Sequence, residues 1–323
     1  MSATSTIEAD NLSRPRLGIS ECLMGAPVRF NGGHKRSRYC ADVLAKYVDF
    51  DVFCPEVAIG LPVPRPPIRM VDDNGNIRVI ATDRPDHDYA PVLVRLADEM
   101  APRLRGLSGY IFMQKSPSCG VNSSKVYSVG GALTGRADGA FAGRLKECLP
   151  HLPVTEAGQL NDAAIRENFI ARVYAYWRWQ TLVMPNLSIT ALTDFHHRYK
   201  LLLQLHDEKM ARQMGWLLAC GSSTQLDALA RRYIELFMVV TEKPAPRRRH
   251  AANLMKVYRF LKKHLTGGER DESRQLIEQY RDGIVPLVVP TAMFKFFLRK
   301  YDCAGAIALI EPYPVELGLH NEL

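Results

Sequence analysis

Short apolar runs and amphipathic stretches alternate through the first half of the chain. Runs rich in β-branched and aromatic residues predict strands at residues 16–20, 48–53 and 109–113. Apolar residues at helical spacing predict helices at residues 37–47, 86–105 and 138–148. Strands that alternate with helices are typical of a parallel sheet covered on both faces. This half is therefore expected to be an α/β domain with a doubly wound, mainly parallel sheet.

Three other segments of the first half do not follow this alternation. Residues 68–71 and 77–81 flank Asp73-Asn74-Gly75-Asn76, which is typical of a tight β-hairpin. This hairpin either walls one side of a pocket or decorates the edge of the sheet, and decoration is the favoured interpretation. Glycines at 130, 131 and 135 predict a loop-like segment, and residues 152–155 are expected to form a last strand.

From Asn161 onwards the alternation stops and helical patterns follow one another. Helices are expected at residues 162–183, 192–205, 208–219, 226–240, 246–265, 269–281 and 291–301. Residues 283–290 are apolar with two prolines and are expected to thread between helices. The predicted organisation is a disordered N-terminus over 1–15, an α/β domain over 16–157 and an all-α domain over 158–323.

Three cysteines fall just past the ends of the three main predicted strands. They are Cys22, Cys54 and Cys119. The carboxyl ends of strands in an open parallel sheet are where ligands bind. The Cys-x-x-Cys pairs of zinc knuckles, redox centres and ferredoxins are absent from the sequence. Three soft thiolates from separate loops suit an iron–sulfur cluster or zinc.

The remaining cysteines and the clustered histidines are given no metal role. Cys40 and Cys148 lie in helical patterns and are interpreted as core residues, while Cys220 and Cys303 lack strand-end settings and are interpreted as structural. The histidines at 196, 197 and 206 are expected to serve packing or polar contacts.

The charge of the chain is unevenly distributed. The net charge is +8, and residues 1–160 hold 19 Lys and Arg against 17 Asp and Glu, whereas residues 161–323 hold 23 against 17. Most of the positive excess therefore lies away from the three cysteines. This division suits a catalytic half followed by a half that binds a polyanion.

Two basic segments are candidates for anion binding. Arg29, Lys35 and Arg36 flank Gly32-Gly33, whose amides could cradle an anion, and their position beside Cys22 favours substrate binding over a solvated turn. The second segment is the helix predicted at 246–265, whose basic residues suit a phosphate backbone or an ordinary solvated face. The RNA-binding candidates there are Arg248, Arg249, Lys256, Arg259 and Lys263.

Four segments of the first half resemble the thiouracil desulfidase family. They are Glu21–Gly25, Val28–Gly33, Phe53–Val57 and Lys115–Gly120, and the likeness covers roughly residues 16–155. In the second half, residues 194–202 and 280–287 resemble a YbgA-like helical domain. Chains that combine both halves resemble RNA desulfidases, which remove sulfur from 4-thiouridine in transfer RNA.

The resemblance implies a cofactor and a set of reactive side chains. The cofactor is a cubane [4Fe-4S] cluster held by Cys22, Cys54 and Cys119. Three protein ligands leave one iron open, and an open iron is a Lewis acid for soft sulfur.

A functional acid and a functional hydroxyl are implied in the same motifs. They fall on Glu56 and Ser116, with Glu21 and Ser118 as alternatives. Glu56 is also the carboxylate nearest to Cys54 in sequence, which suits a general base, and Ser116 suits a proton donor or relay.

The expected function is therefore hydrolytic removal of sulfur from 4-thiouridine in transfer RNA, with no obligatory protein partner. Desulfuration of free thiolated bases, a cluster-containing nucleic-acid-binding regulator and a structural zinc site stay open. The sequence lacks both a secretory signal pattern and an apolar run near the ~20 residues that span a bilayer, so a cytoplasmic protein is expected.

Overall fold

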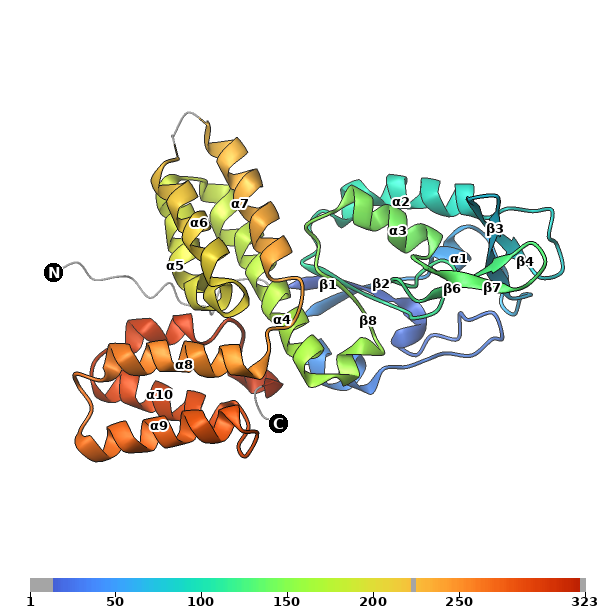
Figure 1. Cartoon of the computed structure of the whole chain (residues 1–323). Helices are drawn as coiled ribbons and strands as arrows, with labels where there is room; N and C mark the ends of the chain where they lie inside the picture. Colours follow the sequence, from blue (N-terminus) through green and yellow to red (C-terminus); the bar gives the residue numbers. More distant parts are fainter. Residues whose placement is uncertain (1–13, 222–224, 320–323) are drawn as a thin grey trace.

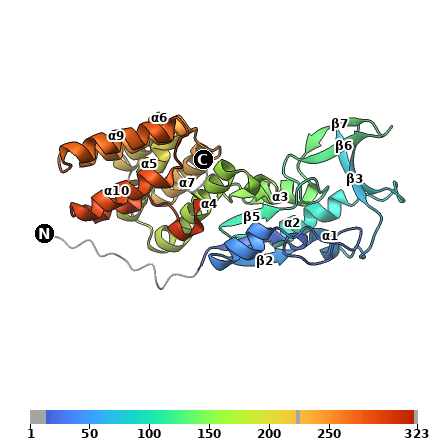
Figure 2. The ribbon, with the colours of Figure 1, turned by 90° about the horizontal axis from the view of Figure 1, so that it is seen from below.

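The computed structural model describes residues 14–221 and 225–319. Residues 1–13, where the sequence predicts disorder, lie outside the described residues. An α/β part and an all-helical part lie side by side and are joined by helix α4 (Ala163–Arg178) (Figure 1). The same separation is visible from below (Figure 2). The predicted fold class, α/β followed by all-α, is confirmed.

The main sheet contains four parallel strands in the order β2-β1-β5-β8. Their bounds are Arg16–Ser20 for β1, Asp49–Phe53 for β2, Gly109–Phe112 for β5 and Val154–Glu156 for β8. From β1 the chain first adds β2 on one side and later β5 on the other. The carboxyl ends of β1 and β5 therefore flank a topological switch point, where open parallel sheets bind ligands.

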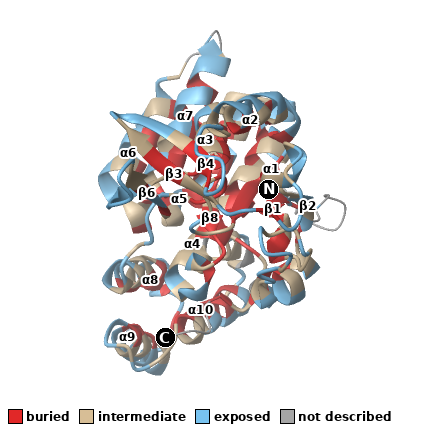
Figure 3. Ribbon diagram, turned by 90° about the vertical axis from the view of Figure 1, so that its right-hand side faces the viewer, coloured by how far each residue is buried: buried red, intermediate tan, exposed pale blue. Residues whose placement is uncertain are grey.

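Helices cover both faces of this sheet. Leu17, Ile19 and Ile111 point into a core shared with α4, whereas Tyr110 and Phe112 point into a core shared with α2 (Ala90–Leu104) and α3 (Ala140–Cys148). Alternate residues of a strand face opposite sides, which explains this division. The doubly wound arrangement predicted from the alternation is present, and buried residues concentrate on the strands and the inner helix faces (Figure 3).

Close packing explains one glycine of β1. A Cβ on Gly18 would lie 2.2 Å from the ring of Tyr110, far inside van der Waals contact. Tyr110 in turn stacks on Phe112, with ring centroids 4.1 Å apart. The absence of a side chain at Gly18 therefore lets this aromatic pair lie flat on the strand.

A second four-stranded sheet has the order β4-β3-β6-β7. Its strands are β3 (Ile68–Asp73), β4 (Asn76–Ala81), β6 (Ser124–Ser128) and β7 (Leu133–Ala137). The β3–β4 hairpin confirms the predicted turn, in which Asn74 and Gly75 have φ of 55° and 87°. Gly130 and Gly131 lie in the turn between β6 and β7, as the loop-like interpretation expects, but Gly135 lies within β7, where that interpretation was wrong, because β7 pairs with β6 and β6 with β3. Only tertiary pairing makes these short polar stretches into strands.

Some predicted helices differ in detail. Residues 37–47 form an irregular helical segment, with a π-helical turn at Tyr39–Val43 and a 3-10 turn at Leu44–Lys46. A short helix, α1 (Pro55–Ala58), follows β2. Helix α10 (Val288–Lys300) starts earlier than predicted, so the last three residues of the segment expected to thread between helices are helical.

The helical part follows the predicted order. After α4 come α5 (Ile189–His206), α6 (Glu208–Ala219), α7 (Leu226–Val240), α8 (Arg247–Leu261), α9 (Gly267–Arg281) and α10. Helices α5, α6 and α7 share one core, and its aromatic centre consists of Trp179, Phe195, Tyr233 and Phe237. No helix in the described ranges is long and apolar enough to cross a membrane.

Helix α4 belongs to both cores. Phe169 and Val173 pack with the main sheet, whereas Ala175 packs with α5 and α7. The C-terminal segment also returns to the sheet side, where Leu317 joins the core and Tyr47 donates a hydrogen bond to the Glu316 carbonyl (3.1 Å). The predicted boundary at 157/158 stays a prediction, since the α/β core depends on residues beyond it.

Candidate active site

A cavity of about 520 Å³ lies at the carboxyl ends of β1, β2 and β5. This volume falls in the range of small-molecule sites. The second sheet closes one side through β3 and β6. Its polar and thiol lining residues are Ser20, Glu21, Cys22, Arg29, Lys35, Cys54, Glu56, Arg65, Arg69, Gln114, Lys115, Ser116, Cys119, Lys125 and Tyr127.

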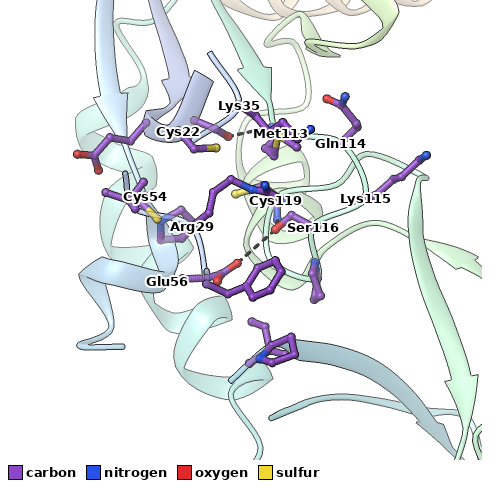
Figure 4. A pocket seen from close by; sticks show the side chains of 18 of the residues that line it. Cys22, Arg29, Lys35, Cys54, Glu56, Met113, Gln114, Lys115, Ser116 and Cys119 are labelled. Atoms are coloured by element: carbon purple, nitrogen blue, oxygen red, sulfur yellow. Dashed lines mark hydrogen bonds between the residues drawn. The ribbon is translucent and has the colours of Figure 1, made fainter. Parts of the chain in front are cut away.

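The three predicted thiols line this one cavity. Cys22 lies in a 3-10 turn after β1, Cys54 is the N-cap of α1 after β2, and Cys119 follows β5 in a loop. Their sulfur atoms are directed toward the same space (Figure 4). The structure thus gathers residues that are 32 and 65 positions apart in the chain, while their role as ligands stays a prediction.

Burial makes these thiols hard to ionise by themselves. It raises the pKa of Cys22 to about 11, with the nearby Cys54 as a further cause. Burial also raises the pKa of Cys54 and of Cys119. A bound metal centre deprotonates coordinating thiols outright. Hydrogen bonds from the backbone N–H groups of Val57 and Glu56 partly offset the effect of burial on the pKa of Cys54, which stays raised.

Three thiols that line one cavity are a donor set that an iron–sulfur cluster can use. Within residues 14–221 and 225–319, no three His, Cys, Asp or Glu side chains converge as ligands of one metal ion. A cubane cluster instead takes each thiolate on a different iron, so its ligands surround a space. Cys22, Cys54 and Cys119 surround the cavity in this way.

Glu56 lies at the centre of a hydrogen-bond network beside the thiols. Its Oε2 accepts from Nη2 (2.6 Å) and Nε (3.1 Å) of Arg65, and both side chains are largely buried. Arg65 Nη1 also donates to the carbonyls of Val28 and Pro62. Arg65 therefore fixes the orientation of Glu56 and ties it to the loop that carries Arg29.

The other carboxylate oxygen of Glu56 faces two serines. Glu56 Oε1 accepts from Ser118 Oγ at 2.6 Å and from Ser116 Oγ at 3.3 Å, and the two hydroxyls lie 2.9 Å apart. Ser116 lines the cavity, whereas Ser118 is fully buried beneath it. Ser116 and Ser118, the two candidates for the functional hydroxyl, thus both contact Glu56, the predicted base, but only Ser116 lines the cavity. Glu21, the alternative acid, also lines the cavity.

Two further side chains shape the loop that carries Cys119. Glu156, at the end of β8, accepts from the Val121 backbone N–H (2.7 Å) and from Ser123 Oγ. Ser20 Oγ accepts from the Met113 backbone N–H at 2.9 Å. Sequence reasoning missed both residues. Ser20 ends the strand predicted before Cys22, and Glu156 comes directly after the strand predicted at residues 152–155.

Of the three basic residues around Gly32-Gly33, two line the cavity and one lies outside it. Arg29 and Lys35 line the cavity, as their proposed role in substrate binding requires. Arg36 lies outside the lining and pairs with Asp42 at 2.5 Å. The β3–β4 hairpin contributes Ile68 and Arg69 to the cavity wall, so the preference for edge decoration was wrong.

The predicted basic stripe of α8 does not reach the cavity. Lys256 pairs with Glu208 (3.3 Å), and Arg249 donates to the His206 carbonyl, so both have partners on neighbouring elements. Arg248, Arg259 and Lys263 are exposed.

Comparison with known proteins assigns each half of the chain. The model of the 2-thiouracil desulfurase family matches residues 17–157, and a family of unknown function, DUF1722, matches residues 200–314. The uncharacterized protein YbgA of Escherichia coli strain K12 is 30% identical over 143 residues, which are 44% of this chain and 85% of YbgA. This chain belongs to the YbgA family.

The α/β half of this YbgA-family protein is similar to the 2-thiouracil desulfurase family. A solved structure of the [4Fe-4S]-dependent thiouracil desulfidase TudS aligns with 49% of this chain and all of its own length. The two are 26% identical, and the TM-score is 0.38. The cavity described above lies within the matched desulfurase region.

Proposed function

We propose that this protein removes sulfur from 4-thiouridine in transfer RNA and leaves uridine. Two observations support the desulfidase reaction. Residues 17–157 match the 2-thiouracil desulfurase family, and that region gathers Cys22, Cys54 and Cys119 around one cavity beside Glu56. The observation that carries the proposal is the convergence of three thiols and a fixed carboxylate.

Cys22, Cys54 and Cys119 would hold a [4Fe-4S] cluster as three thiolate ligands. When bound, such a cluster supplies a Lewis acid at an iron without a protein ligand, which suits the soft sulfur of a thiocarbonyl.

Glu56 would act as the general base. Its Oε2 is held by Arg65 and its Oε1 faces the two serines, so Oε1 would take the proton, by way of Ser116, from water that attacks the ring carbon bearing sulfur. Ser116 lies on the cavity wall within reach of Oε1 and would relay that proton, while Ser118 holds Oε1 from below. General base catalysis at such a carboxylate typically contributes 10²–10⁴-fold.

The helical half would bind the RNA. Arg248 and Arg259 expose cationic side chains on α8, Lys263 exposes one in the turn that follows, and residues 161–323 carry most of the positive excess of the chain. A stacked base must leave its helix to enter a cavity, at a cost of a few kcal/mol. Phosphate contacts on the helical half would offset this cost.

The proposal is tested on anaerobic protein reconstituted with iron and sulfide. Transfer RNA containing 4-thiouridine is added, and loss of the thiocarbonyl absorption is followed together with release of sulfide. We expect the wild type to be active and the Cys22→Ala, Cys54→Ala and Cys119→Ala variants to be inactive. Cys148→Ala is the matched control, because Cys148 lies in the same domain outside the cavity lining.

Two outcomes would redirect the proposal. A loaded wild type that binds the RNA but leaves its thiocarbonyl intact would contradict RNA desulfuration. Free 2-thiouracil and 4-thiouridine assayed in parallel then test the second candidate, desulfuration of free thiolated bases, which the description of the matched family favours. Zinc without iron in the purified protein would overturn the cluster.

A further inference from the structure

Three cations lie in a row across neighbouring strands of the second sheet. In the β6–β7 ladder, Lys125 lies opposite Arg136. In the parallel β3–β6 ladder, Met70 lies opposite Val126. Extending that register by one residue sets Arg69 opposite Lys125. The row Arg69–Lys125–Arg136, named here the cationic row, thus crosses β3, β6 and β7.

The cationic row faces away from the core and begins in the cavity. Met70 and Val126 are buried in the core shared with α2 and α3. Because strand residues alternate between faces, the cationic row lies on the opposite face. Arg69 and Lys125 both line the cavity, and Arg136 continues the row toward the exposed edge strand.

No carboxylate of the described residues forms an ion pair with the cationic row. Arg136 donates only to the Ser123 carbonyl, at 3.0 Å, and the Nε of Arg69 is buried without a hydrogen-bond partner in the described part of the chain. Arg78 on neighbouring β4 differs, since it has Asp88 at 3.7 Å. Like charges directly opposite each other on neighbouring strands destabilise a sheet. A bound anion would remove this repulsion.

The charge of the whole cavity favours the same kind of ligand. Its lining includes six Lys and Arg residues and only two acids, Glu21 and Glu56. Arg65 is already paired with Glu56. The remaining cations lie on two sides, with Arg29, Lys35 and Lys115 on loops of the main sheet and Arg69 and Lys125 on the second sheet.

We propose that the cationic row is a phosphate subsite, which binds the phosphate next to the nucleoside whose base enters the cavity. The proposal rests on the proposed function for the identity of that base. The phosphate is a monoester in a free nucleotide and a diester in RNA. Both offer anionic oxygens for the charge-assisted hydrogen bonds that Arg and Lys form. Arg69 would fix the phosphate at the cavity wall, and Lys125 and Arg136 would extend contacts along the backbone.

The test measures binding without the sulfur chemistry. Uridine 5′-monophosphate and uridine are titrated into the full-length reconstituted protein by calorimetry, and the ratio of their dissociation constants is compared between variants. We expect the wild type to prefer the monophosphate by about ten-fold or more, as hydrogen bonds to charged groups allow. Arg69→Gln combined with Lys125→Gln should remove most of this preference. Arg95→Gln combined with Arg103→Gln on α2 removes the same charge away from the cavity and should keep it.

Three results decide between the proposals. If the ratio of the dissociation constants for uridine and uridine 5′-monophosphate is unchanged in the Arg69→Gln, Lys125→Gln protein, the subsite is overturned. The phosphate would then bind near Arg29 and Lys35. A loss of affinity for a uridine oligonucleotide with an unchanged monophosphate ratio would overturn it as well, because the row would then contact the backbone remote from the base. Sulfide release from 4-thiouridine is followed separately, so a failed desulfidase reaction is distinguishable from a failed phosphate subsite.

Discussion

Arg65 donates two hydrogen bonds to one oxygen of Glu56 and leaves the other oxygen to Ser116 and Ser118. The guanidinium is almost fully buried, and its remaining nitrogen binds the carbonyls of Val28 and Pro62. The carboxylate is therefore held in one orientation by groups from the loops after β1, β2 and β5. A base that acts on a positioned water needs such a fixed orientation.

Replacing Arg65 should reduce the rate of sulfide release. Arg65→Lys keeps a positive charge but cannot donate in the two-pronged geometry of a guanidinium, so we expect a loss of about 10²-fold, the size attributed to a misplaced reacting group. Glu56→Gln should lose 10²–10⁴-fold, the range of general base catalysis. Single-turnover sulfide release on cluster-loaded protein measures both. A wild-type rate for Arg65→Lys would show that the second hydrogen bond is dispensable.

The two serines should differ in their effects. Ser116 lines the cavity and Ser118 is buried beneath it, although Ser118 makes the shorter contact with Glu56. We expect Ser116→Ala mainly to reduce turnover, with some loss of stability as well, because Ser116 Oγ also accepts from the backbone N–H groups of Ser118 (3.3 Å) and Cys119 (3.2 Å). Ser118→Ala should lower stability by about 1–3 kcal/mol, since a buried acceptor loses its partner. Thermal unfolding and sulfide release distinguish the two, and the reverse order of effects would make Ser118 the relay.

A chain that ends at residue 157 should be unstable. It would lack α4, whose Phe169, Ile170 and Val173 cover the main sheet. Each such side chain contributes about 1.5–3 kcal/mol when buried. A chain that ends at Arg178 retains α4 and is the control. Circular dichroism melting and binding of a hydrophobic dye compare them, and equal melting temperatures would mean that the sheet is stable without α4.

Acid should destabilise the helical half through His196. Burial lowers the pKa of His196 to about 4 from an ordinary 6.5, and its Nδ1 lies 3.1 Å from Tyr233 Oη. Between these pH values the unfolded chain binds a proton that the folded chain does not. Stability should therefore fall as the pH drops from about 6.5 to 4, by up to about 3 kcal/mol for this residue.

His196→Gln removes this contribution and should flatten the dependence of unfolding free energy on pH. His206, whose pKa burial also lowers to about 4, is still present in this variant and continues to make the free energy of unfolding depend on pH. His87→Gln changes an exposed histidine and serves as the control. Urea denaturation at several pH values measures the effect, and an equal acid slope in wild type and His196→Gln would contradict it.

The exposed cations of α8 and of the turn that follows it should set the salt dependence of RNA binding. Arg259→Gln and Lys263→Gln should each reduce the slope of log affinity against log salt by about one, as for the loss of one phosphate contact. Binding of transfer RNA is measured by filter retention across a salt series. Arg95→Gln, which removes a surface charge from α2, should leave the slope unchanged, and an unchanged slope in the Arg259→Gln and Lys263→Gln variants would show an ordinary solvated face.

The amphipathic pattern predicted the helices of the second half, because each buries a continuous apolar stripe that is visible in sequence. Strands β1, β2 and β5 were likewise predicted. β1 and β5 are buried, largely apolar runs, whereas β2 is a partly exposed edge strand that its aromatic and β-branched residues indicate. Strands β6 and β7 were missed. Their stretches carry few buried residues, and β6 becomes a strand only when Val126 pairs with Met70 more than fifty residues earlier.

The sequence by itself determined where the three cysteines gather, because residues that follow the strands of a parallel sheet meet at one edge of that sheet. Only the tertiary structure decided what surrounds them. Arg65 lies in a proline-rich loop that has no regular pattern, and its contact with Glu56 depends on how that loop folds back. Arg69 and Lys125 belong to a second sheet whose register is a long-range property. Contacts between distant segments leave no pattern in the local sequence. These contacts orient Glu56, the proposed base, and form the wall of the cavity.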